Sequence, residues 1–349
     1  MKRTRKPVSA LTKQMKDKVN KVKKKSAEYD GNTEVMISTG STLLDLAISG
    51  GRIRGGGIPG GILVEAFGPN SSGKTVLLCE IAGDVQRHEG QVMFHDPEAR
   101  LNKQFAQMFD LDTDNIDYST PNTVPQVFMA VRKWEPEGKK IHGVFADSLA
   151  ALSTDMEMDK DEGDKMGMRR AKEFSEELRK TCRIIKEKNL LMVCSNQVRV
   201  NVGGGDWGPK YTTPGGESIG FYSSLRLQFS APTKLKEKKT IKGKEITKII
   251  GVKTDITVFK SSIWEPYHTA TIYIQFDYGV DDIRANLQFV KDFTGNTVYT
   301  VNENTLSKSI KEATMMVEEQ GLVNELKEQT IDLWEDIQRK FKSTRKPKR

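Results

Sequence analysis

The sequence feature that most constrains the fold is a short segment that matches the phosphate-binding pattern G-x-x-x-x-G-K-[ST] at every fixed position. The segment consists of Gly68, Pro69, Asn70, Ser71, Ser72, Gly73, Lys74 and Thr75. In this pattern the glycines let backbone N–H groups approach a phosphate, the lysine binds the β- and γ-phosphates, and the hydroxyl binds Mg²⁺. We therefore expect these eight residues to bind a nucleoside triphosphate.

The segments on either side of this loop have the composition that the motif requires. Residues 62–67 are an apolar run typical of a buried strand, and residues 75–87 carry apolar side chains at helical spacing. A helix that begins at the loop points the positive end of its dipole at the bound phosphates. Strand, loop and helix thus come in the order that the motif requires. The alternative to a phosphate-binding loop is a glycine-rich turn that matches the pattern by chance.

The rest of the chain alternates between predicted strands and predicted helices. Strands are expected at residues 91–96, 141–148 and 190–194, and helices at 104–108, 124–134 and 168–188. Such alternation predicts an α/β fold with a mostly parallel, twisted sheet that is flanked by helices on both faces. Strands at 225–229, 254–259 and 270–276 are expected to close the sheet with antiparallel edges, and a lysine-rich hairpin at 233–248 to turn at Lys242-Gly243.

Polar side chains lie at or just beyond the ends of three of these strands, near the edge of the sheet where the phosphate loop is expected. Glu98 is a candidate base that activates water for attack on a γ-phosphate, and its alternative role is to begin a helix. Asp147 suits Mg²⁺ binding through the water shell of the ion. The amide of Gln197 suits a γ-phosphate sensor, whereas His95 is expected to be a packed strand residue rather than a catalyst.

The basic residues of the chain are concentrated at its two ends. The net charge of +8 divides into +10 for residues 1–25, +7 for residues 339–349 and −9 for the part between them. Basic ends of this kind attract polyanions. The alternative is that they serve solubility alone.

The chain is expected to have four parts. They are a basic N-terminal helix and linker with a role in oligomerisation (1–33), the α/β core (34–283), a small and largely helical C-terminal region interrupted near Gly321 (284–341), and a basic tail (342–349). The sequence has no apolar segment of transmembrane length and no secretory signal, and its three cysteines lie in apolar segments. We therefore expect a cytoplasmic protein that does not bind membranes.

Two loops have unusual compositions. The loop at about 155–167 begins with acidic residues, but Lys160 stands where a Ca²⁺-binding loop requires a glycine. The loop at about 200–216 is glycine-rich and contains Trp207, Lys210 and Tyr211, which suit stacking on bases and pairing with phosphates. The second loop is therefore a candidate nucleic-acid contact, and the alternative is an ordinary surface loop.

Together these motifs resemble the RecA family of recombinases, from about Ile37 to Asp281. The resemblance is carried by Ser38–Ser41, Gly68–Thr75, Asp96–Glu98, Asp147–Leu152, Gly163–Gly167, Asn196–Arg199 and Thr212–Gly216. It implies a RecA-like P-loop NTPase core that binds ATP and Mg²⁺, forms helical filaments on single-stranded DNA and hydrolyses ATP in a DNA-dependent manner. It also implies homologous pairing and strand exchange with duplex DNA in recombination and DNA repair, mediator or single-strand-binding partner proteins, and a location in a bacterial host cytoplasm or nucleoid.

The resemblance also assigns roles to single residues. It implies that Glu98 activates water, that Gln197 couples the γ-phosphate to DNA affinity, and that Lys260 reaches the nucleotide of a neighbouring subunit. Asn102 and Phe105 fall where the family contacts adenine. The residues implied to line the DNA channel are Met166, Arg169, Arg170, Arg199, Trp207, Lys210, Tyr211, Gly215 and Gly216.

Some positions depart from the family pattern. Ser262 stands where the family has a second lysine after Lys260, and the region after Asp281 is shorter than in bacterial RecA and ends in basic residues. Such a compact form is what we expect if the protein is a homologue encoded by a phage or another mobile element. Two alternatives stay open: a hexameric helicase or motor built on the same core, and a nucleotide-regulated scaffold that coats single-stranded DNA with negligible turnover.

Overall fold

The computed structural model describes residues 35–154, 166–200, 211–212 and 217–345, so the expected N-terminal helix lies outside the described residues. The central element is a ten-stranded sheet with the strand order β12-β11-β10-β8-β1-β5-β4-β2-β3, and β9 pairs with β10 off this path. Its strands are β1 (Ile62–Gly68), β2 (Val92–His95), β3 (Ile116–Ser119), β4 (His142–Ala146), β5 (Leu190–Gln197), β8 (Leu225–Phe229), β9 (Thr233–Ile241), β10 (Lys244–Ser261), β11 (Thr269–Gln275) and β12 (Gly279–Val280).

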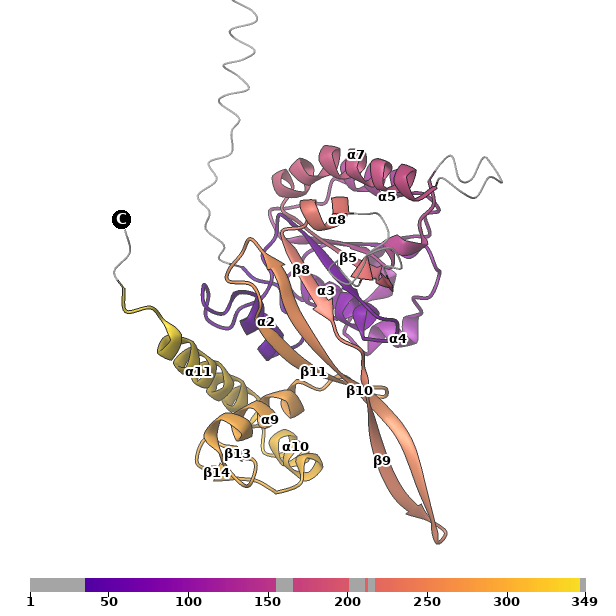
Figure 1. Cartoon of the computed structure of the whole chain (residues 1–349). Coiled ribbons are helices and arrows are strands. Elements are labelled where there is room, and N and C mark those ends of the chain that lie inside the picture. Colours follow the sequence, from indigo (N-terminus) through magenta and orange to yellow (C-terminus); the bar gives the residue numbers. More distant parts are fainter. Residues whose placement is uncertain (1–34, 155–165, 201–210, 213–216, 346–349) are drawn as a thin grey trace, which may run out of the picture. The chain divides into compact units, whose positions relative to one another are not determined.

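The direction of the strands changes once across the sheet (Figure 1). All neighbours from β3 to β8 run parallel, and all neighbours from β8 to β12 run antiparallel. A parallel strand needs a crossover helix, whereas an antiparallel strand needs only a short turn. The predicted α/β class and the antiparallel closing edge are therefore confirmed.

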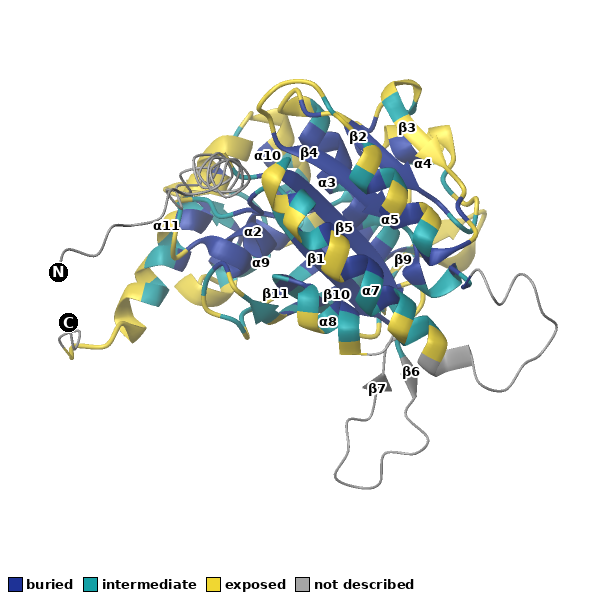
Figure 2. Ribbon diagram, turned by 90° about the horizontal axis from the view of Figure 1, so that it is seen from above, coloured by how far each residue is buried: buried dark blue, intermediate teal, exposed yellow. Residues whose placement is uncertain are grey.

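Helices cover both faces of the sheet. They are α2 (Thr42–Ser49), α3 (Lys74–Arg87), α4 (Lys103–Gln107), α5 (Val124–Lys133), α7 (Met166–Glu187) and α8 (Glu217–Tyr222). Alternate residues of β1 separate the two faces: Val64 and Ala66 pack in the core cluster that contains α2 and α3, whereas Leu63 packs in the cluster that contains α5 and α7. Both faces are buried (Figure 2), which explains why the central strands are rich in apolar residues.

The C-terminal region has its own small core. It contains α9 (Asp282–Thr294), α10 (Ile310–Glu319), α11 (Val323–Phe341) and a short hairpin of β13 (Thr300–Val301) and β14 (Asn304–Thr305). Leu287, Val290 and Val317 pack at its centre. The predicted interruption near Gly321 is confirmed, since this glycine has a φ of +68° between α10 and α11. The helix α9 was not predicted as an element.

Two sets of contacts attach the C-terminal region to the core. Asp282 accepts hydrogen bonds from the backbone N–H and the hydroxyl of Thr42, at 2.8 and 2.7 Å. Trp264 in the β10–β11 connection lies 5.5 Å from Trp334 of α11, measured between ring centroids.

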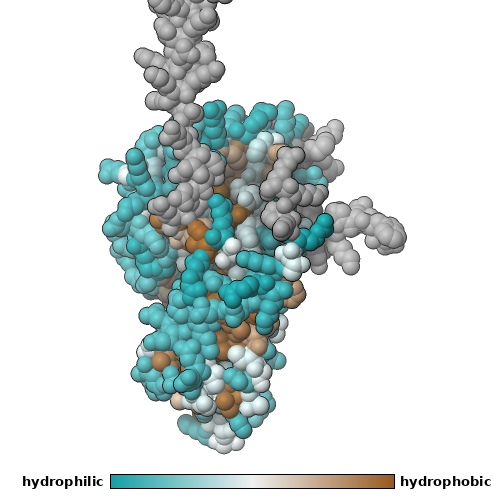
Figure 3. All heavy atoms as spheres, turned by 90° about the vertical axis from the view of Figure 1, so that its left-hand side faces the viewer, coloured by the Kyte–Doolittle hydropathy of each residue, from teal (hydrophilic) through white to brown (hydrophobic). Residues whose placement is uncertain are grey.

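The face on which α11 lies is mostly hydrophilic, with scattered apolar residues (Figure 3). In the part of the chain that the structure describes, no helix is both long and apolar enough to cross a membrane.

The strand β9 and the first part of β10 form a two-stranded hairpin, residues 233–250, that extends beyond the neighbouring strands (Figure 1). Pairing of β10 with β11 begins only at Gly251. Lys242 and Gly243 form the turn with φ values of +49° and +77°, the left-handed conformation that a two-residue hairpin turn favours. The predicted hairpin and its turn are therefore confirmed, and we call residues 233–250 the lysine ribbon.

Candidate functional site

The phosphate loop lies between β1 and α3, as its sequence predicted. Gly73 precedes α3 with a φ of +99°, and a Cβ atom at this position would lie 2.4 Å from Cδ1 of Ile274. A Cβ atom at Gly68 would lie 2.7 Å from the backbone oxygen of Phe229. Ser72 donates a hydrogen bond from its hydroxyl to the carbonyl of Pro69 at 2.8 Å. The loop is therefore closed tightly, and the two glycines are required by lack of space as well as by conformation.

Lys74 is held inside this loop. Its side chain is buried, and Nζ donates to the carbonyl oxygens of Gly68 and Pro69 at 3.1 and 2.6 Å. Burial lowers the pKa of its ammonium group, and the negative charge of Asp147 partly opposes this shift. The lysine therefore lies at the loop in contact with carbonyl groups that a phosphate can replace.

A hydroxyl and a carboxylate meet at the end of β4. Thr75 donates from Oγ1 to Oδ2 of Asp147 at 2.6 Å, and the hydroxyl of Ser195 in β5 donates to the other oxygen of the same carboxylate. These groups are oxygen ligands of the kind that Mg²⁺ prefers. Among the described residues no cluster of three or more His, Cys, Asp or Glu side chains suits a metal ion. The pair predicted from the sequence is thus brought together, and Ser195 is a third member that the motif did not reveal.

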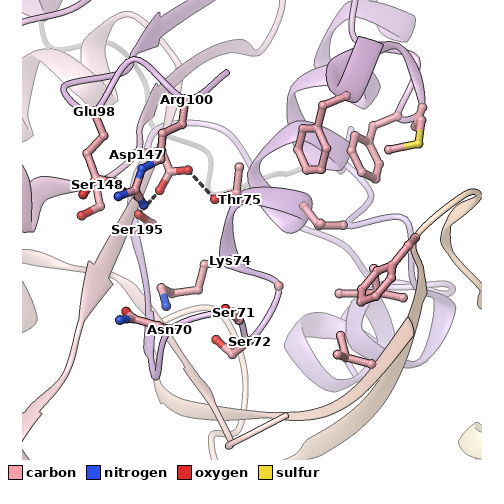
Figure 4. Close-up of a pocket in the computed structure, with 18 of the residues that line it drawn as sticks. Asn70, Ser71, Ser72, Lys74, Thr75, Glu98, Arg100, Asp147, Ser148 and Ser195 are labelled. Atoms are coloured by element: carbon pink, nitrogen blue, oxygen red, sulfur yellow. Dashed lines mark hydrogen bonds and ion pairs between the residues drawn. The ribbon is translucent and has the colours of Figure 1, made fainter. Parts of the chain in front are cut away.

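Glu98 lies beside the same carboxylate, in the turn after β2. It forms an ion pair with Arg100, in which Nη1 and Oε2 are 2.7 Å apart. The turn is held by Asp96, which accepts hydrogen bonds from the backbone N–H of Leu101 at 2.7 Å and from the hydroxyl of Tyr118 at 3.0 Å. Figure 4 shows Glu98, Arg100 and Asp147 at one end of the cavity and the phosphate loop across from them. Arg100 belongs to none of the sequence motifs that indicated the site.

These residues line a single cavity of about 770 Å³. Its polar part consists of the phosphate loop from Asn70 to Thr75 together with Glu98, Arg100, Asp147, Ser148, Ser195 and Gln197. Its apolar part consists of Val76, Phe105, Met108, Phe109, Val252, Ile274 and Phe276. A cavity of this size, apolar at one side and polar at the other, suits a nucleotide with its base against the apolar wall.

Of the two residues expected to contact adenine, one lines the cavity and the other does not. Phe105 lines the cavity, and its ring centroid lies 5.0 Å from that of Phe109. Asn102 does not line it, because Oδ1 of its side chain accepts a hydrogen bond from the backbone N–H of Phe105 at 2.8 Å and begins α4. An asparagine at this position thus has a structural role as a helix cap.

Gln197 ends β5 at the cavity, in front of a buried polar network. Glu65 of β1 is fully buried, and its carboxylate accepts from Nε of Arg226 at 2.6 Å and from Nδ2 of Asn196 at 3.0 Å. The guanidinium of Arg226 also lies 4.5 Å from the ring centroid of Phe67. This network joins β1, β5 and β8 through Asn196, the residue that precedes Gln197. Sequence patterns did not indicate it.

Lys260 lies outside this cavity. Its Nζ donates to the carbonyl oxygens of Gly220 and Phe221 at 2.8 and 2.9 Å, near the end of α8. Burial lowers the pKa of its ammonium group, and the positive charge of Arg226 adds to the effect. Its expected role concerned a neighbouring subunit and stays a prediction.

The expected DNA contacts lie at the margins of the described residues. Met166 begins α7, and Arg199 and Tyr211 belong to the short paired strands β6 (Arg199–Val200) and β7 (Tyr211–Thr212). Arg169 is exposed, and Arg170 donates to the carbonyl of Ala150 at 3.3 Å. Trp207, Lys210, Gly215 and Gly216 lie outside the described residues. These assignments stay predictions.

His95 is the packed strand residue that was expected. It is buried in β2, and its Nδ1 lies 2.7 Å from the hydroxyl oxygen of Ser119. Burial lowers the pKa of the imidazole to about 4, so the ring is neutral at physiological pH.

A strand, phosphate loop and helix, with a carboxylate at the end of a neighbouring parallel strand, define the class of P-loop NTPase folds. Within this class, a model of the RecA N-terminal domain matches residues 8–281 of the chain. The chain therefore belongs to the RecA family.

Two relatives agree with this assignment, and one solved structure is similar to part of the chain. The chain is 33% identical over 247 residues to Protein RecA of Wolbachia sp. subsp. Brugia malayi (strain TRS), which covers 71% of this chain and 65% of that protein. It is 31% identical over 298 residues to Protein RecA of Acholeplasma laidlawii (strain PG-8A), which covers 83% of this chain and 85% of that protein. The crystal structure of the RadB recombinase covers 70% of this chain and 98% of its own, at 19% identity and a TM-score of 0.49.

Proposed function

We propose that the chain is an ATP- and Mg²⁺-dependent recombinase that forms helical filaments on single-stranded DNA and promotes pairing with homologous duplex DNA. The observation that carries the proposal is the cavity in which the phosphate loop, Asp147, Glu98 and Gln197 meet. Membership of the RecA family supports it, since the relatives are named Protein RecA.

The proposed binding step uses the phosphate loop and Lys74. A triphosphate replaces the carbonyl groups of Gly68 and Pro69 as the partner of Nζ, which is favourable because a phosphate carries a full negative charge. Thr75 and Asp147 would hold Mg²⁺, which when bound neutralises charge on the phosphates. The base would lie against Phe105 and Ile274.

The proposed chemical step uses Glu98 as the base that activates water. Its carboxylate is paired with Arg100, so Arg100 must leave Glu98 before the carboxylate accepts a proton. The side chain of Arg100 is 72% exposed and also lines the cavity, so its guanidinium is free to change partner when a triphosphate enters. Glu98 then becomes available only when the nucleotide is in place.

The proposed coupling step uses Gln197. This residue faces the cavity and is two residues before β6, whose pairing with β7 brings together the two ends of the loop expected to contact DNA. A γ-phosphate held by Gln197 therefore biases the position of that loop, and DNA affinity becomes dependent on ATP.

The test is the rate of ATP hydrolysis with and without single-stranded DNA, with Glu98→Gln as the matched variant. We expect strong stimulation by DNA in the wild type and at least a 100-fold lower rate in the variant, because a glutamine cannot accept the proton of water. ATP binding should persist in the variant, and electron micrographs should show ATP-dependent filaments. Closed rings that unwind duplex DNA would favour a helicase, and ATP binding with negligible DNA-stimulated turnover would favour a scaffold.

A further inference from the structure

We propose that Arg100 is a catalytic residue that binds the γ-phosphate of ATP from the end of the cavity opposite the phosphate loop. The inference deepens the proposed function, on which it rests, because it gives the guanidinium a second partner after it leaves Glu98. Arg100 pairs with Glu98 when the γ-phosphate is absent and with the γ-phosphate when ATP is bound. The site then distinguishes ATP from ADP through the position of one side chain.

The first argument is the distribution of charge in the cavity. Among the described residues that line it, the cations are Lys74 and Arg100, and the anions are Glu98 and Asp147. Lys74 lies in the phosphate loop, whereas Arg100 lies across the cavity from that loop (Figure 4). Lys260 donates to backbone carbonyls near α8 and does not line the cavity. Arg100 is therefore the cation of the described chain that faces the phosphate loop across the space for a γ-phosphate.

The second argument is the proximity of Arg100 to the reacting atoms. A general base acts on a water within hydrogen-bond reach, so the proposed role of Glu98 places the γ-phosphate one water molecule away from its carboxylate. The Nη1 atom of Arg100 lies 2.7 Å from Oε2 of the same carboxylate. The guanidinium therefore has only to turn from Glu98 towards the phosphate loop to contact the γ-phosphate.

The third argument is that the backbone of this turn is fixed while the side chain of Arg100 is free. Asp96 is buried, and its carboxylate accepts a hydrogen bond from the backbone N–H of Leu101 at 2.7 Å. The backbone N–H of Ala99 donates to the carbonyl oxygen of Asp96 at 3.0 Å. The side chain of Arg100 is largely exposed, and Glu98 is its one ion-pair partner among the described residues. A change of partner therefore moves the guanidinium and leaves the turn in place.

The fourth argument is the competition between the two partners of Arg100. The side chains of Arg100 and Glu98 are 72% and 23% exposed, and an ion pair with an exposed member contributes little stability. A guanidinium binds a phosphate through two parallel hydrogen bonds, and the γ-phosphate carries more negative charge than a carboxylate. ADP lacks this phosphate, so Arg100 stays on Glu98 and blocks the base when ADP is bound.

The step that Arg100 assists is hydrolysis of the bond between the β- and γ-phosphates. The oxygen of water forms a bond to the γ-phosphorus, and Glu98 takes a proton from that water. The bond from the γ-phosphorus to the bridging oxygen breaks, and ADP leaves with the electron pair. Negative charge is spread over the three other oxygens of the transferred group, and an arginine that contacts them stabilises it. Arg100 makes this contact from within the same chain as the base.

The test compares variants of the full chain. Arg100→Ala removes the guanidinium, and Arg100→Lys keeps the charge without the planar set of donors. The matched control is Arg183→Ala, which removes an exposed arginine of α7 that pairs with Glu187 at 3.1 Å outside the cavity. For each protein we measure kcat and KM for ATP, with and without single-stranded DNA. We also measure the Kd of ADP alone and of ADP with aluminium fluoride, which mimics the transferred phosphoryl group.

We expect kcat of Arg100→Ala to be about 100-fold or more below that of the control, because a group that stabilises transition-state charge is lost. ADP with aluminium fluoride should bind about 100-fold more weakly, whereas the Kd of ADP alone should change by less than about threefold. Arg100→Lys should lose about 10-fold in kcat. Free guanidinium, at a concentration that does not denature the protein, should restore part of the rate of Arg100→Ala and leave the control unchanged.

A second comparison separates contact with the phosphate from an effect through Glu98. Glu98→Gln lacks the base, so an effect of Arg100 that acts only through the carboxylate is absent from this variant. We expect Glu98→Gln/Arg100→Ala to bind ADP with aluminium fluoride about 100-fold more weakly than Glu98→Gln, because the contact with the phosphoryl group is lost.

Three outcomes would overturn the inference. The first is a kcat of Arg100→Ala equal to that of the control. The second is faster hydrolysis by Arg100→Ala without DNA, which would make Arg100 only an inhibitory partner of Glu98. The third is equal binding of ADP with aluminium fluoride by the two proteins that carry Glu98→Gln. Absence of DNA stimulation in the wild type would instead contradict the proposed function, and the binding of ADP with aluminium fluoride would still test Arg100.

Discussion

Ser195 shows how much the candidate site depends on residues outside the recognised motifs. Its hydroxyl donates to one oxygen of Asp147 and leaves the other for Thr75, so the carboxylate has a fixed orientation. Groups that orient a metal ligand in this way affect metal affinity by about 10- to 100-fold.

We expect Ser195→Ala to raise the Mg²⁺ concentration for half-maximal ATP hydrolysis about 10-fold. The reason is that the carboxylate of Asp147 loses the hydroxyl donor that fixes its orientation. The rate at saturating Mg²⁺ should fall less than threefold. A magnesium titration of the rate checks this result, with Ser230→Ala, at an exposed serine near the end of β8, as the control. An unchanged Mg²⁺ requirement would show that Asp147 needs no support from β5.

The residues of the site that the sequence predicted are those that belong to local patterns. The phosphate loop, Glu98, Asp147 and Gln197 each lie at a strand end, and parallel strands bring such ends to one edge. Ser195 and Arg100 could not be predicted in the same way. Their partners depend on the register of β4 against β5, in which Ala146 lies opposite Cys194, and on the path of the turn after β2.

At the scale of elements, the buried pair of Glu65 and Arg226 joins β1 to the neighbouring strand β8. The carboxylate of Glu65 is fully buried, and the side chain of Arg226 is 17% exposed. We expect Arg226→Met to lower the free energy of unfolding by about 3 kcal/mol, because it leaves the buried carboxylate of Glu65 without its guanidinium partner. Urea denaturation measures the change.

The matched control for this prediction is the double variant Glu65→Leu/Arg226→Met. Replacing both members of a buried pair by apolar residues removes the unpaired charge, so we expect much of the lost stability to return. A double variant as unstable as Arg226→Met would show that packing of Arg226 against Phe67, rather than its charge, stabilises the contact.

Most elements of the core were predictable because their burial leaves a clear pattern. Most residues of the strands β1, β4 and β5 are apolar, and the ribbon turn has the residues that its conformation requires. The helix α9 packs against α10, α11, β11 and α2, and it was missed although Ile283, Leu287 and Val290 recur at helical spacing. Its caps, Asp281 and Gly295, are the local signals that could have located it.

At the scale of the whole molecule, buried titratable groups make stability depend on pH. The pKa of His95 is about 4 in the folded chain and about 6.5 when exposed, so the unfolded chain binds more protons between these values. Its contribution is fully present above pH 6.5 and is lost as the pH falls towards 4. Burial raises the pKa of Asp45 and of Glu80 to about 7, so these groups act in the opposite direction.

We expect His95→Asn to reduce the loss of stability between pH 6.5 and pH 4 by up to about 3 kcal/mol relative to the wild type, at 1.36 kcal/mol per pKa unit. The difference between the two proteins isolates His95, because Asp45 and Glu80 are present in both. Urea midpoints across this pH range provide the measurement, and His88→Asn, at the residue that follows α3, is the control. Parallel pH profiles for wild type and His95→Asn would contradict the prediction.

The lysine ribbon has a practical consequence for engineering. Its turn at Lys242 and Gly243 is exposed, and a Cβ atom on Gly243 would meet nothing within 4 Å. Turns of this kind tolerate inserted residues, because the added chain displaces no packed side chain. A fluorophore or short affinity tag placed there would not contact the nucleotide cavity. For the same reason, natural variation can change the length or the charge of the ribbon with little effect on the free energy of unfolding.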